Sequence, residues 1–287
     1  MPIDPRVALS APAQEQEFSW TTSDVLLYHL ALGAGAQPND PRELRYTFEK
    51  NLQVLPTFAV VAATLRATEA PRVASPGIDI ELSKVVHGGQ GITVHRSLPT
   101  EGTGRASTKV TEIWDKGSAA VIVSETEVVD AQGNPLWTSR SSVFARGEGG
   151  FGGERGPSSA STTPDREPDQ VLHTTTLPQQ ALLYRLLGDR NPLHSDPEFA
   201  VAAGFPAPIL HGLATYGIVC KAAVDGMLDG DVTRVRGFET RFAGVVFPGE
   251  TLSTSVWRED GRLVLRTTVD ERDNAAALSD TILELNQ

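Results

Sequence analysis

The chain has 287 residues, of which 40% are hydrophobic and 21% are charged. This composition is typical of a globular protein, and no apolar run reaches the ~18 residues that a membrane span needs. The formal net charge of −11 argues against nucleic acid or an anionic membrane as the partner. The single cysteine, Cys220, excludes an internal disulfide bond and suits a reducing compartment, and the first residues carry no export pattern. We therefore expect a cytoplasmic protein.

The first half of the chain shows two helix patterns followed by strand patterns. A capped helix is predicted to follow Phe18 and to run to Gly33, and a second helix is predicted from about Pro56 to Thr68. The second is apolar nearly all round, as buried helices are. From Ile78 onward the segments alternate and are rich in β-branched residues, which predicts four or five antiparallel strands with a hairpin turn at residues 130–135.

Residues 147–170 contain Gly, Ser, Pro and charge without any period, which predicts a linker or long loop between two halves. In the second half, Thr176 is expected to cap a helix, and Asp196 to cap a short helix that Gly204 closes. A long helix is predicted from about His211 to Leu228, and four strand patterns follow it.

The two halves repeat one plan. Tyr28 corresponds to Tyr184 at an offset of 156, and Leu55 corresponds to Leu210 at an offset of 155. Two copies of one unit, nearly in register, are the simplest interpretation. A unit in which the apolar face of a sheet wraps one buried helix is an α+β arrangement.

An acid, an amide and a histidine lie close together in the second half, at Asp189, Asn191 and His194. A carboxylate and an imidazole that converge can hold a water molecule and move protons to and from it. The same residues also suit an ordinary turn after a helix, and the spacing alone leaves both interpretations open. The first copy has Gly33 and Pro38 at the positions of the acid and the histidine, so we expect one active site per chain.

Gly212 lies where the long helix is predicted to begin. Backbone N–H groups at a helix N-terminus lack intrahelical partners, and a glycine lets a ligand oxygen approach them closely. A carbonyl bound there would be polarised, as in an oxyanion hole. Together with Asp189 and His194, this predicts addition of water to a carbonyl-conjugated double bond, or its removal. The alternative is a helix N-terminus that serves the fold alone.

Other residues have two interpretations each. The segment HGGQG, residues 87–91, would bring backbone against an extended ligand or form a glycine-rich bulge. Phe242 suits the core or the wall of a pocket. Positive charges that would pair with phosphates, or simply lie on the surface, are Lys116, Arg146, Arg155, Arg190 and Arg241.

The sequence gives no indication of a metal or a nucleotide cofactor. His29, His95 and His173 fall in no metal-ligand spacing, and no CxxC or HxxxH is present. No glycine-rich nucleotide loop precedes a helix in the required strand context, which argues against NAD and ATP. Cys220, within the long apolar helix, is expected to be a core residue.

The motif GDRNPLH at 188–194, followed by FPAPILHG at 205–212, resembles the hydratase 2 motif of the MaoC-like (R)-specific 2-enoyl-CoA hydratases. Nearly the whole chain resembles the two-copy form of that family, which includes the hydratase module of peroxisomal multifunctional enzymes. The resemblance implies a double hotdog fold in which each half wraps a sheet around a long helix. The halves would be residues 1–150 and 171–287, joined by a linker at 151–170.

The resemblance also implies the roles of individual residues. Asp189 and His194 would be the catalytic pair, Asn191 would belong to the site, and the Gly212 N–H would bind the thioester oxygen. The residues that would contact acyl-CoA are His87, Gly88, Lys116, Arg190 and Phe242. The family needs neither a metal nor a redox cofactor.

The expected reaction is (R)-specific, reversible hydration of trans-2-enoyl-CoA to (3R)-3-hydroxyacyl-CoA. The alternatives are dehydration in lipid synthesis, acyl carrier protein in place of CoA, and a non-catalytic acyl-CoA-binding protein. Because Pro71 would end the helix of the first half early, we also expect room for a medium, long or bulky acyl chain. Monomer and homodimer both remain open, since two hotdog units in one chain already make a dimer-like unit.

Overall fold

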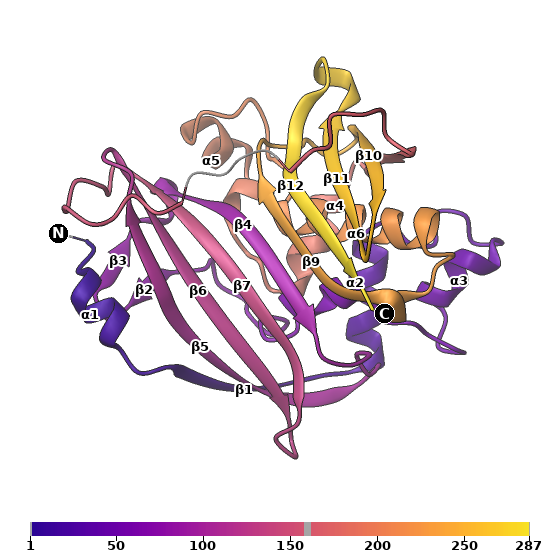
Figure 1. Ribbon diagram of the computed structural model, residues 1–287, viewed down its shortest axis with the longest axis horizontal. Coiled ribbons are helices and arrows are strands. Elements are labelled where there is room, and N and C mark those ends of the chain that lie inside the picture. The colour runs from indigo at the N-terminus through magenta and orange to yellow at the C-terminus, as the bar shows by residue number, and fades with distance from the viewer. Residues whose placement is uncertain (1, 158–161, 287) are drawn as a thin grey trace.

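The computed structural model describes residues 2–157 and 162–286 (Figure 1). Ten of the described strands form one antiparallel sheet, in the order β1-β5-β6-β7-β4-β9-β12-β11-β10-β8. The strands from β1 to β4 in this order belong to the first half of the chain, and those from β9 to β8 belong to the second. The halves are joined where β4 pairs with β9, with Gly89 opposite Arg241. The two predicted sheets are therefore one continuous sheet.

The predicted strands are present, and the hairpin turn at residues 130–135 joins β6 to β7. In the first half the strands of the large sheet are β1 (Gln14–Trp20), β4 (Val85–Val94), β5 (Gly102–Asp115), β6 (Ala119–Asp130) and β7 (Pro135–Arg146). In the second half they are β8 (Gln170–Thr175), β9 (Val235–Phe242), β10 (Thr251–Glu259), β11 (Arg262–Val269) and β12 (Ala275–Leu285). A separate pair consists of β2 (Val73–Ser75) and β3 (Ile78–Ile80).

The edge strands β1 and β8 were not predicted. Both lie at an edge of the sheet and are largely exposed, so their sequences, QEQEFSW and QVLHTT, carry little apolar alternation. Exposed edge strands are commonly polar, because unpaired apolar edges promote aggregation. The alternation of buried and exposed residues that predicts a strand is therefore absent from β1 and β8.

The helices comprise α1 (Pro5–Ser10), α2 (Thr22–Ala31), α3 (Pro41–Thr47), α4 (Gln180–Tyr184), α5 (Pro197–Ala202) and α6 (Gly212–Met227). The predicted α2 is capped by Thr21, which forms a capping box with Asp24. Asp196 caps α5, and α6 matches the predicted long helix. Helices α1 and α3 were not predicted, although each begins with an Asp N-cap followed by Pro.

The prediction of an α-helix over residues 56–68 is wrong. The chain makes a short 3₁₀ helix, η1 (Pro56–Val60), followed by turns. Its N-cap has no side-chain hydrogen bond, and the β-branched residues that follow lower helix propensity. The expected burial is correct, because Pro56 to Ala59 are all buried. Only the second half therefore has the long central helix that the double hotdog resemblance implied for both.

Thr176 does not cap a helix, contrary to expectation. Helix α4 begins after Gln179, which makes no side-chain capping bond. Instead, the Thr176 hydroxyl donates to the carbonyl of Glu250 at 2.9 Å and accepts from the N–H of Gly249 at 2.8 Å. The residue therefore joins the end of β8 to the turn before β10.

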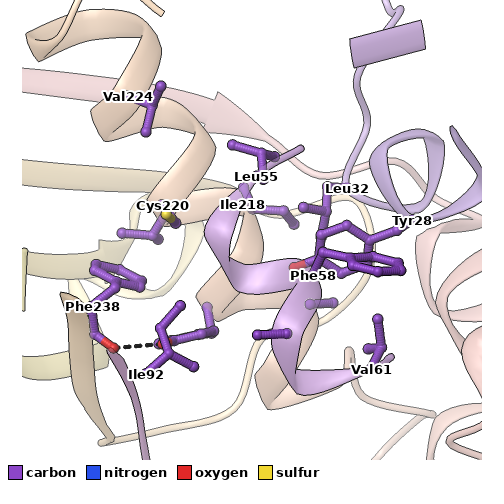
Figure 2. Packing of buried hydrophobic residues seen from close by; sticks show 14 of the residues in the cluster. Tyr28, Leu32, Leu55, Phe58, Val61, Ile92, Ile218, Cys220, Val224 and Phe238 are labelled. Carbon is purple, nitrogen blue, oxygen red and sulfur yellow. Dashed lines mark hydrogen bonds between the residues drawn. The ribbon is translucent and has the colours of Figure 1, made fainter. Parts of the chain in front are cut away.

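Helix α6 is the centre of the hydrophobic core. Figure 1 shows α6, α4 and α2 gathered behind the strands of the second half. In the core, Ile218 of α6 lies beside Leu55, the N-cap of η1 (Figure 2), and Cys220 and Val224 of α6 belong to the same buried cluster. Cys220 is fully buried and unpaired, as a core residue would be. The buried helix of one half thus packs against the short helix of the other.

The predicted linker begins with an anchored segment. The carboxylate of Asp115 accepts N–H groups from Gly117 at 2.8 Å, from Gly150 at 2.8 Å and from Gly152 at 2.7 Å. These bonds hold the pKa of Asp115 at about 2, because they stabilise the charged form. Residues 158–161 of the predicted linker lie outside the described residues. Among the helices that the structure describes, none is both long and apolar enough to cross a membrane.

Candidate active site

The loop between α4 and α5 places Asp189 and His194 together. After α4 the chain makes a 3₁₀ turn, η3 (Arg185–Leu187), and Gly188 ends it with φ of 106° in the left-handed region. A second 3₁₀ turn, η4 (Pro192–His194), follows and carries the histidine. One ligand atom each from Asp189, His194 and His211 lie within 4.8 Å of one another. The two residues predicted as acid and base do converge, and a second histidine joins them.

His194 is buried, and one of its ring nitrogens is hydrogen-bonded to the backbone. The Nδ1 atom lies 2.9 Å from the carbonyl oxygen of Ile209. A carbonyl oxygen only accepts, so Nδ1 carries the proton and Nε2 keeps a lone pair. Burial lowers the pKa of His194, while the charge of Asp189 acts in the opposite direction. The ring is thus a neutral base beside a carboxylate.

Asp189 and Asn191 also build the turn itself. The Asp189 Oδ1 atom accepts the N–H of Asn191 at 3.2 Å, and the Asn191 Oδ1 atom accepts the N–H of Leu193 at 3.1 Å. The interpretation of this motif as a helix-ending turn is therefore confirmed, and the interpretation as a catalytic loop stays a prediction. Asp189 remains partly exposed, whereas His194 is 8% exposed. The acid is therefore more accessible to solvent than the histidine.

His211 was not predicted as a site residue. Its ring stacks on the His194 ring, with centroids 3.7 Å apart and planes at 27°, and its Nε2–H donates to the Asp189 carbonyl oxygen at 3.3 Å. Imidazole lone pairs lie in the ring plane, so two stacked rings direct them side by side and not toward one point. This geometry is poor for two nitrogens that would share a tetrahedral metal ion.

Gly212 is the first residue of α6, and the aromatic ring of Phe242 covers it. A Cβ built on Gly212 would lie 3.1 Å from two ring atoms of Phe242. The ring of His87 packs against Phe242 with centroids 4.8 Å apart. Burial lowers the pKa of His87 to about 4, and the nearby charge of Asp189 acts against that shift. His87, Phe242 and Gly212 therefore form one wall beside the acid.

The segment HGGQG forms a bulge and also lines a depression in the surface. The pairing of β4 with β7 shifts register between His87 and Gly89, which leaves Gly88 as the bulged residue. Residues 88–91 border a depression of 280 Å³, together with Trp114, Lys116, Arg140 and Arg241 among others. Both interpretations of this segment are compatible with the structure, since the bulge brings backbone to the floor of the depression.

The predicted cations take different positions. The Lys116 ammonium lies 5.3 Å from the centre of the Trp114 ring and donates to the Pro157 carbonyl at 3.4 Å. Arg241 forms an ion pair with Asp280 at 3.3 Å. Arg190 lies elsewhere, where its Nε–H donates to the carbonyl of Ala67 at 3.3 Å. Lys116 and Arg241 therefore share the depression, whereas Arg190 connects the loop between α4 and α5 to the first half. Arg146 and Arg155 are exposed.

The remaining histidines lie outside the site. His29 is fully buried, where its Nδ1–H donates to the Tyr46 carbonyl at 2.8 Å and its Nε2 accepts the Leu55 N–H at 3.2 Å. His95 and His173 pair with the hydroxyls of Thr138 and Ser253. His29 is therefore a structural link between α2 and η1.

Two family models match the two halves. The MFE-2 hydratase 2 N-terminal domain matches residues 18–147, and the MaoC like domain matches residues 159–278. The chain is 58% identical over 279 residues to enoyl-CoA hydratase ChsH3 of Mycobacterium tuberculosis, covering 97% of this chain and 98% of that protein. It is 40% identical to enoyl-CoA hydratase 2, peroxisomal, of Arabidopsis thaliana, covering 90% of this chain and 88% of the plant protein.

Solved structures support the same relationship. A MaoC-like dehydratase from Phytophthora capsici superposes with a TM-score of 0.89 at 30% identity, covering 99% of this chain and 98% of that one. The full-length peroxisomal multifunctional enzyme type 2 from Drosophila melanogaster superposes with a TM-score of 0.82 at 33% identity, covering 96% of this chain and 48% of that one. The chain is a double hotdog protein that belongs to the MaoC-like hydratase 2 family of hydro-lyases.

Proposed function

We propose that this protein catalyses the (R)-specific hydration of trans-2-enoyl-CoA to (3R)-3-hydroxyacyl-CoA. The observation that carries the proposal is the convergence of Asp189 and His194, with a lone pair left on His194 Nε2. His211 stacks on His194 and immediately precedes Gly212, so the N-terminus of α6 lies next to the pair. Acid, base and a free helix N-terminus are the groups that hydration of an unsaturated thioester requires.

In the proposed mechanism, Asp189 and His194 hold one water molecule over the C2=C3 bond. Its oxygen adds to C3 while a proton reaches C2 from the same face, so the water is consumed and both catalytic groups return to their starting state. The Gly212 N–H binds the thioester oxygen as enolate-like charge develops there. Single donors of this kind typically contribute ~3 kcal/mol to transition-state stabilisation.

CoA as the carrier is supported by the relatives and by charge. Several relatives are named enoyl-CoA hydratases. Lys116 and Arg241 border the depression that residues 88–91 of β4 also line, and their positive charges would pair with phosphate groups. His87, Gly88 and Phe242 would contact the acyl thioester. We propose Arg190 as an indirect contributor, because its guanidinium is bonded to Ala67.

Loss of enoyl absorbance with purified protein, followed by chiral analysis of the product, tests the proposal. Asp189→Asn and His194→Gln should each abolish turnover of crotonyl- or decenoyl-CoA while the protein stays folded. Asp79→Asn and His95→Gln are matched controls, because Asp79 and His95 are exposed and lie outside the site. Rates near that of the wild type in either site variant, or a (3S) product, would contradict the proposal.

Dehydration is the second candidate, and one relative supports it. The chain is 42% identical over 287 residues to 3-hydroxyacyl-thioester dehydratase Y of Mycobacterium tuberculosis. The same site would catalyse the reaction in both directions. The experiment therefore measures kcat/KM on (3R)-hydroxyacyl-CoA and compares it with kcat/KM on the same acyl group attached to acyl carrier protein. Binding of both thioesters without turnover would instead identify a non-catalytic acyl-CoA-binding protein.

We propose that the reaction needs no metal and takes place in the cytoplasm, as part of fatty-acid oxidation. Prior treatment with a strong chelator should leave the rate unchanged, consistent with the stacked arrangement of His194 and His211.

The acyl chain is proposed to run toward η1, although Trp20, Trp137 and Phe58 pack closely there. A higher kcat/KM on ten- to sixteen-carbon substrates than on four-carbon ones is expected. Light scattering would distinguish a monomer from a homodimer.

A further inference from the structure

One buried side chain contacts both members of the Asp189/His194 pair. The face of the His211 ring lies on the His194 ring at 3.7 Å, and its Nε2–H donates to the Asp189 carbonyl at 3.3 Å. We infer that His211 is a positioning residue, which sets the orientation of the His194 ring and the place of Asp189 relative to it. The inference rests on the function proposed above, and it assigns His211 no direct contact with the substrate.

The His194 ring needs a second restraint. Its Nδ1–H bond to Ile209 holds one edge of the imidazole but leaves the ring free to tilt about that bond. The stacked His211 ring blocks this tilt, because rotation of either plane would push ring atoms into contact. Together, the bond and the stack direct His194 Nε2 toward the space beside Asp189. Proton transfer depends steeply on such geometry, and a displacement of about 1 Å can cost roughly 100-fold in rate.

His211 is itself held firmly enough to act as a support. It is 1% exposed, its own backbone is the N-cap of α6, and the Tyr184 ring packs against it with centroids 4.9 Å apart. The rings therefore form a row from Tyr184 through His211 to His194. A displacement of the N-terminus of α6 would move the imidazole and the Gly212 N–H together.

A histidine at position 211 destabilises the core more than an apolar ring of the same size would. Its Nδ1 atom is buried and has no hydrogen-bond partner among the described residues. A buried polar atom without a partner destabilises the folded state, and a phenylalanine of similar shape would avoid that loss. The Nε2–H donated to Asp189 is what a phenylalanine cannot supply. The observed residue therefore fits a role at the catalytic loop better than a role in the core.

His211 is uncharged at neutral pH. The titratable groups that face it are Tyr184 and Arg185 from the α4–η3 segment, Asp189 and His194. Burial, with contributions from His194 and Arg185, lowers the pKa of His211 well below its usual value. Its Nε2–H donor is consequently present throughout the neutral range, and no second positive ring forms against His194.

The test compares His211→Phe, which keeps a stacked ring and loses the N–H donor, with His211→Ala, which loses both. We expect kcat on an enoyl-CoA to fall about 10-fold in the Phe variant and about 100-fold in the Ala variant, with KM changed less than about threefold. His95→Ala is the control, since His95 lies outside the site. A retained kcat in both variants would overturn the inference and leave the proposed function intact.

Nitrogen-15 NMR of the histidine rings gives a readout that does not depend on activity. The wild type should show His194 as the neutral Nδ1–H tautomer and His211 as the neutral Nε2–H tautomer at neutral pH. The Ala variant should show a shifted or broadened His194 signal, because the ring tilts about its bond to Ile209, whereas the Phe variant should keep the wild-type signal. A protonated His211 in the wild type, or an unchanged His194 signal in the Ala variant, would overturn the inference even if either variant folded poorly.

Discussion

Gly188, in the second half of the chain, lies directly against the backbone of Thr64 in the first half. A Cβ built on Gly188 would lie 1.9 Å from the carbonyl oxygen of Thr64. Thr64 also donates its hydroxyl to the Leu187 carbonyl at 3.4 Å, and Arg190 donates to the Ala67 carbonyl at 3.3 Å. Because Gly188 immediately precedes Asp189, contacts from the first half restrain the start of the loop that carries Asp189 and His194.

Gly188→Ala should therefore be far more damaging than an ordinary glycine substitution. The control is Gly204→Ala: both glycines have a left-handed φ, of 106° and 89°, but Gly204 has no atom within 4 Å of a built Cβ. We expect Gly204→Ala to lower the free energy of unfolding by about 1 kcal/mol, from the backbone strain alone. Gly188→Ala should cost roughly 1–3 kcal/mol more, from overpacking, and should reduce kcat. Equal unfolding curves in urea for the two variants would show that Thr64 does not restrain the loop.

Gly212→Ala should reduce kcat at least about 10-fold, because a methyl group at the start of α6 would hinder the approach of the thioester oxygen to the N–H. The new Cβ would also press on Phe242 at 3.1 Å. The double variant Gly212→Ala/Phe242→Leu separates the two effects, since it relieves the contact and keeps the methyl group. If the double variant recovers the wild-type kcat, the loss came from packing, and Gly212 does not bind the substrate in the proposed way.

Asp189→Asn should lower the pKa of His194 further. Burial lowers that pKa and the negative charge of Asp189 raises it, so removing the charge leaves the burial effect unopposed. Titration of the His194 ring by NMR in both proteins measures the change directly. A rise in the pKa, or no change, would mean that Asp189 and His194 are not coupled electrostatically.

The free energy of unfolding should fall as the pH decreases from about 6.5 to about 4. Burial holds the pKa of His29 and of His87 at about 4, below the ~6.5 of an unfolded histidine, so the unfolded chain binds more protons in this window. His29 alone would account for about 3 kcal/mol across the whole window. Stability from Asp24, whose pKa is about 2, is lost only below that range.

Urea unfolding at pH 7, 6 and 5 measures this dependence, and His95→Gln is the control because His95 is exposed. We expect the control to follow the wild-type curve. A free energy of unfolding that stays constant from pH 7 to pH 5 would contradict the assignment of neutral buried histidines.

The features that were predicted correctly from the sequence are mostly local. Thr21 with Asp24, and Asp196 with Pro197, indicate helix starts because capping joins residues two or three positions apart. The long apolar run from His211 predicts α6 for the same reason. The convergence of Asp189 and His194 was predictable because only five positions separate them.

The features that were missed depend on contacts between distant parts of the chain. Residues 56–68 have the composition of a buried helix, but they lack a capping bond and lie against α6, β4, β7 and β9 as a short 3₁₀ helix and turns. Strand β1 is polar, and only its pairing with β5 makes it a strand. Propensity is a weak guide wherever tertiary contacts decide the backbone.

By itself, the sequence determined the repeat, the α+β class, the proximity of Asp189 and His194, and the glycine at the start of α6, because spacing along the chain carries that information. The tertiary structure alone decided that His211 stacks on His194 and that the Thr64 backbone closes against Gly188. The first contact joins residues 17 positions apart and the second joins residues 124 positions apart. The first contact arises when the loop after α4 folds against the start of α6, and the second arises only when the two halves pack together. No local sequence pattern encodes either contact.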